Sequence, residues 1–439
     1  MPTPLQAAAP SLLCEEAWRP GRSADHYRQV LRRLLAGQRP AAISDYRCFS
    51  DGQIPADSLT AVEGYGQVVR HGLSSQVLFD ALKARFALIL SRDQQEGMKR
   101  RSLLAWSGGY ASEAALLAYA RTGERRFLQL FVDYFDAVIE RRDDRLQRFD
   151  DYHRRVMKAW GSSRIDSNRW IALITQNAHI LWPASRFALL VHQRPELAPW
   201  RATAERYQRV CQETLAEFED DWQQHPQAPA GTLWYLRPPE REAEATNRVH
   251  LVGRVWLNLA RLQGGSQYRE RIHALIRIFR QGVVQESDGS VHWNYFPFFA
   301  TGEMRRYPNG QDRSEPVWKG ALTVPFLWEA SAAGYPVPAE LLQAIAQSFE
   351  QVLNEEGEIQ RNLSPLSSRL MDADRDSEKI GMLQAVFGVV DFAKLRPAIL
   401  TRLTELVARR PDLFPGAWLG SDAGLIGYAA LLSPAQPPR

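Results

Sequence analysis

Apolar residues recur along this chain with the period of amphipathic helices, and the helices come in pairs. Leu395, Ile399, Leu403 and Leu406, for example, fall at i, i+4, i+8 and i+11, which places them on one stripe of an α-helix. Each pair has an apolar helix, a short turn marked by Gly or Pro, and a second helix near an aromatic residue. Such hairpins are recognisable at residues 114–139, 187–215, 255–279, 326–352 and 383–407. Successive copies lie roughly 60–70 residues apart, which is longer than the standard solenoid repeats.

These repeated hairpins predict an all-α fold, an (α/α) toroid or incomplete barrel. Strand signals are thin, and residues 291–299 are too isolated to build a sheet. The loops between hairpins exceed the roughly 2–8 residues that connect helices in bundles, which favours a closed ring over an open helical solenoid. A ring of this kind places its inner helices around a funnel and its loops at one rim, where functional residues commonly lie.

The chain is predicted to form one domain, residues 23–432, between a loose N-terminal segment (1–22) and a loose C-terminal tail (433–439). The proline-containing stretch 223–239 is interpreted as a loop inside that domain. No apolar run reaches the roughly 18–20 residues of a membrane span. The N-terminus lacks a signal-peptide pattern, so the chain is either cytoplasmic or a trimmed mature form from the periplasm. Compartment and oligomeric state stay open.

Composition narrows the possible partners. The formal net charge of +4 is small, and basic and acidic residues are interspersed, so nucleic acid is not an expected partner. Cys14, Cys48 and Cys211 lie far apart, and the histidines show no HxH or HExxH spacing, so we expect neither a metal nor another cofactor. Thirteen tryptophans are unusually many, and indole planes bind the apolar faces of sugar rings. The expected partner is therefore a polysaccharide or oligosaccharide.

Polar and aromatic residues crowd together between the hairpins, and these clusters recur at the same phase of the repeat. Taken singly, each has a structural explanation, such as a helix-end histidine, an aromatic at the edge of the core, or a surface ion pair. Their recurrence instead predicts that they converge at one rim. The members singled out are Asp151, Tyr152 and His153; Asn177, His179 and Trp182; Trp234, Tyr235, Asn247, Arg248 and His250; and Trp293, Tyr295, Arg306, Glu315 and Trp318.

Two of these segments resemble carbohydrate-active (α/α)-toroid enzymes, namely polysaccharide lyases and the related glucuronyl C5-epimerases. The segments are Asn-Ala-His-Ile-Leu-Trp-Pro-Ala-Ser-Arg-Phe from Asn177 and Glu-Pro-Val-Trp-Lys-Gly-Ala-Leu-Thr-Val-Pro-Phe-Leu-Trp-Glu-Ala from Glu315. The resemblance covers about two thirds of the chain as a pattern, without a strict signature. In many relatives a histidine follows the acidic residue closely, whereas here Trp318 and Lys319 stand at that place.

The resemblance implies a lyase that cleaves a uronate-containing polymer by β-elimination. In that interpretation Asn177 and Arg306 neutralise the uronate carboxylate, His179 removes the C5 proton, and Tyr295 protonates the leaving oxygen; Glu315 matches the acidic residue of the relatives. Arg248 and Arg306 would supply positive charge for an anionic polymer. The residues expected to bind substrate are Tyr152, His153, Trp182, Trp234, Tyr235, Asn247, Arg248, His250, Trp293 and Trp318.

Three other functions remain open. Epimerisation at C5 uses the same groups and reprotonates the sugar from the opposite face. An inverting glycoside hydrolase needs two carboxylates about 6.5–9.5 Å apart, for which Asp151 and Glu315 are the candidates. A non-catalytic sugar-binding scaffold would keep the aromatic residues and need no acid or base.

Overall fold

The computed structural model describes residues 74–95, 102–163, 168–239, 241–263, 265–300, 314–352, 359–364, 419 and 422–432. The predicted hairpin at 383–407, Arg306, Cys14 and the two end segments lie outside the described residues. The proposed domain boundaries therefore stay predictions.

Four helical hairpins follow one another along the described chain, and they confirm the first four predicted from the sequence. They are α5 (Leu103–Thr122) with α6 (Arg125–Ile139), α8 (Ile174–Gln193) with α9 (Arg201–Ala216), α10 (Thr246–Gln263) with α11 (Ser266–Gly282), and α12 (Gly320–Ala332) with α13 (Ala339–Val352). The described residues also form α4 (Ser75–Gln95), the single turn α7 (Asp143–Leu146) and α18 (Asp422–Leu431).

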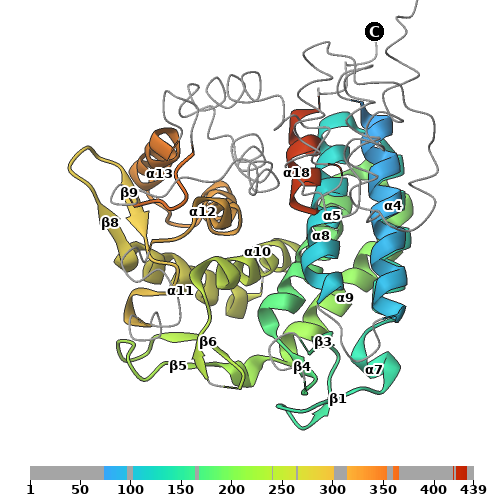
Figure 1. Ribbon diagram of the computed structural model, residues 1–439, viewed down its shortest axis with the longest axis horizontal. Coiled ribbons are helices and arrows are strands. Elements are labelled where there is room, and N and C mark those ends of the chain that lie inside the picture. The colour runs from blue at the N-terminus through green and yellow to red at the C-terminus, as the bar shows by residue number, and fades with distance from the viewer. Residues whose placement is uncertain are drawn as a thin grey trace, which may run out of the picture.

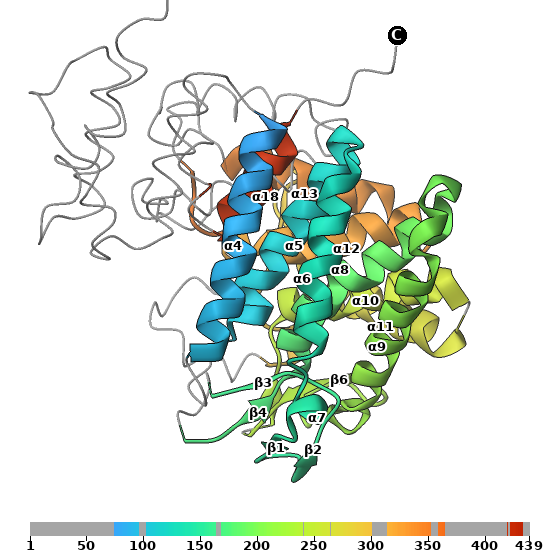
Figure 2. The ribbon, with the colours of Figure 1, turned by 90° about the vertical axis from the view of Figure 1, so that its right-hand side faces the viewer.

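The first helices of the hairpins pack side by side as the inner layer of a ring. Helix α5 contacts α8, α8 contacts α10, and α10 contacts α12, while α18 from the C-terminal end packs on α5 (Figure 1). The second helices lie outside this layer, with α6 against α5, α9 against α8 and α11 against α10 (Figure 2). The protein is thus an all-α (α/α) toroid, and the described residues form an incomplete ring of it.

The two ends of the inner helices are connected very differently. At their C-terminal ends the chain turns into the outer helix within a few residues, or through the short helix η3 (Pro195–Trp200) between α8 and α9. At their N-terminal ends, long loops with small antiparallel strands precede each inner helix from α8 onward. The rim formed by these loops is called the hairpin rim below.

The hairpin rim contains β1 (Phe149–Asp150) paired with β2 (Arg155–Val156), and β3 (Gly161–Ser162) paired with β4 (Ile171–Ala172), before α8. Before α10 lie η4 (Glu219–Asp221) and the sheet of β5 (Trp222–Gln224), β6 (Leu233–Arg237) and β7 (Glu242–Ala243). Before α12 lie β8 (Val283–Gln285), β9 (Val291–Trp293) and η6 (Val317–Lys319).

Two local predictions were wrong at this rim. Residues 291–299 contain β9, which pairs with β8 so that Val283 lies opposite Trp293. Residues 223–239, interpreted as a loop, supply β6 and most of β5. Strands of two to five residues are too short to show a clear alternation of apolar and polar positions, so the pairing partner, not the local sequence, determines them.

Close backbone approach holds the inner helices together. A Cβ atom at Gly109 of α5 would lie 2.7 Å from the carbonyl oxygen of His179 on α8. A Cβ atom at Gly253 of α10 would lie 2.6 Å from the ring of Phe326 on α12. Glycine at these two positions therefore permits the tight packing that brings polar groups of neighbouring helices into one funnel.

No helix among the described residues is long and apolar enough to cross a bilayer.

Candidate functional site

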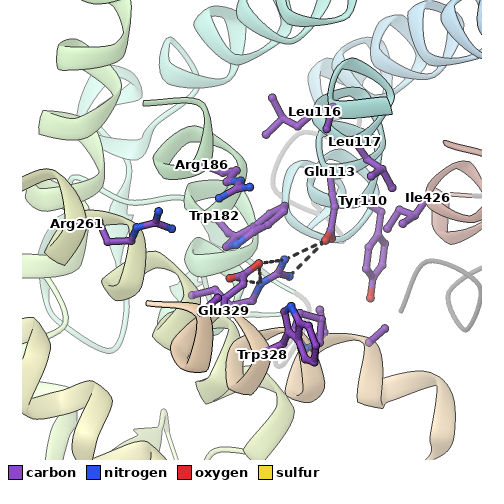
Figure 3. A pocket seen from close by; sticks show the side chains of 16 residues that line it. Tyr110, Glu113, Leu116, Leu117, Trp182, Arg186, Arg261, Trp328, Glu329 and Ile426 are labelled. Atoms are coloured by element: carbon purple, nitrogen blue, oxygen red, sulfur yellow. Dashed lines mark hydrogen bonds and ion pairs between the residues drawn. The ribbon is translucent and has the colours of Figure 1, made fainter. Parts of the chain in front are cut away.

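A cavity of about 280 Å³ occupies the funnel, and every described inner helix contributes to its wall. Tyr110 and Glu113 come from α5, Trp182 from α8, and Trp328 and Glu329 from α12; α10 and α18 complete the lining (Figure 3). The lining thus combines three aromatic side chains with two carboxylates. This combination of flat apolar faces and acid/base groups can hold and act on a sugar ring.

Arg254 of α10 joins the two carboxylates across the funnel. Its Nη2 donates to Glu329 at 2.9 Å and to Glu113 at 3.3 Å, and its Nε lies 3.2 Å from the second oxygen of Glu329. Its guanidinium carbon also lies 3.8 Å from the centre of the Trp182 ring. Because both carboxylates bond to the same nitrogen, their nearest oxygens are separated by no more than two hydrogen-bond lengths.

The environment of Glu113 favours its protonated form. Burial raises the pKa of Glu113 above its ordinary value, and the negative charge of Glu329 adds to this, while Arg254 opposes it. Burial also opposes the charge of Arg254, but Glu329 and Glu113 outweigh it and raise the pKa of that guanidinium. Glu113 therefore holds a proton more readily than a carboxyl group in water, which is the property required of a general acid.

Trp182 is the predicted binding residue that lines this cavity. Its side chain is 5% exposed, and its indole N–H has no hydrogen-bond partner within the described part of the chain. It lies inside helix α8, which continues through Pro183. The cavity thus has one aromatic wall residue that the sequence already indicated as a binding residue.

At the hairpin rim, His153 ties two loops together. Its Nδ1 lies 2.9 Å from Asp150 and its Nε2 lies 3.1 Å from Asp221, so the ring bridges the β1–β2 turn to η4. Burial opposes protonation, but hydrogen bonds to both aspartates outweigh it and raise the pKa of His153 to about 9. Neighbouring Tyr152 is partly buried beside the His153 ring, and Asp151 accepts a hydrogen bond of 2.6 Å from the Trp170 backbone.

Asn177 and His179 lie in the first turns of α8 and are both fully buried. Asn177 accepts from the Trp160 backbone N–H at 2.9 Å and donates to two carbonyls, at 2.8 and 3.2 Å. The amide therefore fastens the β3 loop to the start of α8.

Neither ring nitrogen of His179 has a hydrogen-bond partner among the described residues, and its ring contacts the rings of Trp106 and Tyr110. Burial, with a contribution from Arg254, lowers the pKa of His179 to about 3, so the imidazole is neutral. His179 thus lies behind Tyr110, which itself lines the cavity.

The third predicted group is divided between the core and the inner helices. Trp234 and Tyr235 are fully buried, and the Trp234 indole donates to the Glu244 carbonyl at 2.8 Å. Arg248 bonds to the Glu244 carboxylate at 3.1 Å.

His250 and Asn247 lie on α10 and are buried. His250 packs against the rings of Phe279 and Phe326, and burial lowers its pKa to about 3. Within the described residues, the Asn247 side-chain oxygen has no hydrogen-bond partner.

Glu315 lies fully buried before α12, where it accepts hydrogen bonds from the Trp293 indole and from the Thr323 hydroxyl, the latter at 2.9 Å. Burial raises its pKa to about 7, although these hydrogen bonds and the charge of Lys319 oppose the shift. Lys319 also lies 3.8 Å above the ring of Tyr295 and 5.3 Å from that of Trp318.

The structure therefore divides the predicted residues between two places. Trp182 lies in the funnel, whereas Asp151, Tyr152, His153, Trp234, Tyr235, Trp293, Tyr295, Glu315 and Trp318 lie in the loops and strands of the hairpin rim. Asn177, His179, Asn247, Arg248 and His250 lie in the first turns of α8 and α10 and do not line the cavity. The roles assigned to all of them stay predictions.

Sequence reasoning missed the charged residues of the funnel. Glu113 is the lone carboxylate of the Ala- and Leu-rich helix α5, and Glu329 is the lone charge of α12. A single charge within an otherwise apolar helix is the signal that could have identified both.

Among the described residues, no group of three His, Cys, Asp or Glu side chains is placed to hold a metal ion.

No protein-family model matches this chain, and no curated protein matches it either. Among solved structures, it is similar to an inactive variant of an α-1,6-mannanase from Salegentibacter sp. HEL1_6 in complex with α-1,6-mannotriose. That match has 10% identity and a TM-score of 0.48, and covers 82% of this chain and 99% of the other. Unsaturated glucuronyl hydrolase from Bacillus sp. GL1 matches with 15% identity and a TM-score of 0.43, covering 74% of this chain and 84% of the other.

A polysaccharide lyase matches with 11% identity and a TM-score of 0.44, and the match covers 82% of this chain and 99% of the lyase. Because identity and TM-score are low in every case, none of these names assigns an activity to this chain.

Proposed function

We propose that the protein is a carbohydrate-active enzyme that binds a saccharide in the funnel cavity and hydrolyses a glycosidic bond there. One observation supports this proposal: aromatic rings and two carboxylates that share Arg254 line the same cavity. Hydrolysis of a glycosidic bond requires two carboxyl groups with different protonation states, one on each side of the bond. Glu113, whose pKa is raised, is the candidate acid of such a pair, and Glu329, which shares Arg254 with it, is the candidate for the second group.

In this mechanism the rings of Trp328 and Tyr110 stack against sugar faces, and Trp182 contributes the small exposed part of its ring to the cavity wall. Protonated Glu113 gives its proton to the leaving glycosidic oxygen while the Glu329 carboxylate attacks the sugar carbon, and water then cleaves the resulting glycosyl ester as Glu113 takes up the water proton. The two hydrogen bonds from Arg254 fix the orientation of Glu329. The products are a new reducing end and an alcohol, and the proton lost from water balances the proton given by Glu113 over the cycle.

Elimination from a uronate is the second candidate, because arginines line the same cavity and can neutralise a uronate carboxylate. In that case Tyr110, which contacts His179, lies where a base could reach a bound sugar. The sequence-based lyase candidates Asn177, His179, Arg306, Tyr295 and Glu315 belong to this second proposal, and none of the four that the structure describes, all but Arg306, lines the funnel cavity. C5 epimerisation would share its first step.

Product chemistry separates these proposals. Purified protein would be incubated with alginate, pectate, glucuronan, glycosaminoglycans and neutral polymers, and both ultraviolet absorbance and reducing ends would be followed. Hydrolysis predicts reducing ends without an absorbance rise, whereas elimination predicts both, because it creates an unsaturated uronate. Epimerisation would change neither signal, but would exchange the C5 hydrogen with solvent deuterium.

The variant Glu113→Gln keeps the size of the side chain and removes the acid, so hydrolysis should fall with it. Exposed Glu205 of α9 offers a matched control as Glu205→Gln. Equal activity of Glu113→Gln and the control on every polymer that is cleaved would reject Glu113 as the acid. Unchanged polymers across the whole panel, together with no saccharide binding, would reject the proposed function.

A further inference from the structure

Two arginines line the funnel cavity without a counter-charge of their own. Arg186 comes from α8 and Arg261 from α10. Neither forms a hydrogen bond or ion pair with any residue that the structure describes. Arg254, by contrast, bonds to both Glu113 and Glu329, so the two carboxylates of the lining already have a cation between them.

In the protein without a ligand, the surroundings of Arg186 destabilise its charged form. Burial lowers the pKa of its guanidinium, and Arg254, Arg261 and Arg194 add positive charge around it, while Glu329 only partly offsets these effects. A partly buried guanidinium without hydrogen-bond partners is unfavourable, because it has lost water without gaining hydrogen bonds in exchange. An anion that enters the cavity would restore those hydrogen bonds.

The net charge of the cavity lining also favours an anionic ligand. Three arginines face two glutamates, and Glu113 tends to keep its proton because its pKa is raised. The cavity is therefore positive overall. A guanidinium with free N–H groups matches the geometry of a carboxylate or sulfate, to which it can donate two parallel hydrogen bonds.

The neighbourhood of Arg186 also suggests what carries the anion. Arg186 follows Trp182 by four residues, so both lie on one face of α8, and Figure 3 shows them as neighbours at the cavity. A sugar ring in contact with Trp182 would have its substituents within reach of Arg186. A bare inorganic anion would leave the Trp182 ring without a function in binding.

We infer that Arg186 and Arg261 form an anion-binding subsite that takes the acidic group of a saccharide in contact with Trp182. The acidic group is an oxyanion, either a uronate carboxylate or a sulfate ester. This inference rests on the proposed function, since it assigns an acidic saccharide to the same cavity. It names binding residues only, and no proton transfer depends on them.

Calorimetric binding tests the subsite. The probes are a tetraglucuronate, a sulfated galactotetraose, the same galactotetraose without sulfate, and inorganic sulfate. The proteins are the unmodified chain, Arg186→Gln, Arg261→Gln, and the control Arg209→Gln, which removes an exposed arginine from outer helix α9. Arg186→Gln should weaken binding of the matching acidic probe about tenfold or more, because a charge-assisted pair is lost. The neutral galactotetraose and the control variant should show no change.

The outcomes separate this inference from the proposed function. Preference for tetraglucuronate or for the sulfated sugar identifies the oxyanion. Equal binding of acidic and neutral sugars, unaffected by Arg186→Gln and Arg261→Gln, would overturn the subsite and leave the proposed function standing. Sulfate binding that is lost in Arg186→Gln, with no saccharide binding at all, would keep an anion site and reject the proposed function. If Arg186→Gln does not fold, Arg261→Gln, at an exposed position, provides the same comparison.

Discussion

The polar groups of the hairpin rim and those of the funnel differ in their hydrogen-bond partners. Around the hairpin rim, carboxylates and amides bond to backbone groups, as Asp150 does to the Ala172 N–H at 2.6 Å and Asn177 does to Trp160. In the funnel, Glu113 and Glu329 bond to one guanidinium, and Arg186 has no partner among the described residues. The crowded polar groups therefore stabilise loops, whereas the sparse charges on apolar helices remain available to a ligand.

Neutralising a funnel carboxylate should have the largest effect on turnover. Glu329→Gln should lower turnover about 10²- to 10⁴-fold, because the proposed nucleophile is removed while the side-chain volume stays. The rim control Asp151→Asn should keep turnover within about twofold of the unmodified protein. Initial rates on the polymer that the protein cleaves provide the measurement, with circular dichroism to verify folding. If Glu329→Gln kept its turnover and Asp151→Asn lost it, the catalytic site would instead lie at the hairpin rim.

The second-largest effect is expected when the side-chain amide of Asn177 is removed. Asn177→Ala removes hydrogen bonds to Trp160 and Leu173 in a fully buried site, so the free energy of unfolding should fall by about 2–4 kcal/mol. Urea denaturation measures the change, and Asn168→Ala, at an exposed position, should have a much smaller effect. The folded fraction of Asn177→Ala should keep its turnover. A stable but inactive variant would instead support Asn177 as a neutraliser of the substrate.

The hydrogen bonds of His153 to Asp150 and Asp221 make the free energy of unfolding depend on pH. Its pKa is about 9 in the folded protein and about 6.5 as an ordinary histidine, so the folded state binds the proton more tightly. Its contribution is complete below pH 6.5 and is lost as the pH rises through 9, by roughly 2–3 kcal/mol in all. Urea denaturation from pH 6 to pH 9.5 should show this loss, and His153→Gln should abolish the part due to this residue. A slope unchanged in the variant would remove His153 as its source.

The smallest expected effect concerns Glu315. Its pKa is about 7 in the fold and 4.5 as an ordinary glutamate, so its contribution to stability falls as the pH rises from 4.5 to 7 and then stays level. Glu315→Gln does not titrate, and relative to the unmodified protein it should gain about 1–2 kcal/mol between pH 5 and pH 8. Turnover should persist if Glu315 only supports the loop before α12. An inactive, fully folded variant would instead support the sequence-based prediction of a catalytic Glu315.

The helices could be predicted from the sequence because their apolar residues repeat with a period that each helix carries within itself. Trp182 was predicted as a binding residue for a similar reason, since it stands in a local aromatic and polar cluster. The grouping of Glu113, Arg254 and Glu329 could not be predicted in this way. These residues lie on α5, α10 and α12, and they meet only because the ring makes those helices face one funnel. Local clustering therefore indicated the loops and missed the pocket.

The contact between α18 and α5 has a consequence for synthesis. Ile426 of α18 belongs to the cavity wall, and the Tyr428 hydroxyl accepts a hydrogen bond from the Ser74 backbone N–H across 354 residues of sequence. A growing chain can form the local hairpins as they leave the ribosome, but it cannot finish the cavity until residues 422–432 have emerged. Ligand binding would therefore begin only after residues 422–432 have left the ribosome, and shorter nascent chains would carry an open apolar wall on α5 that chaperones can recognise.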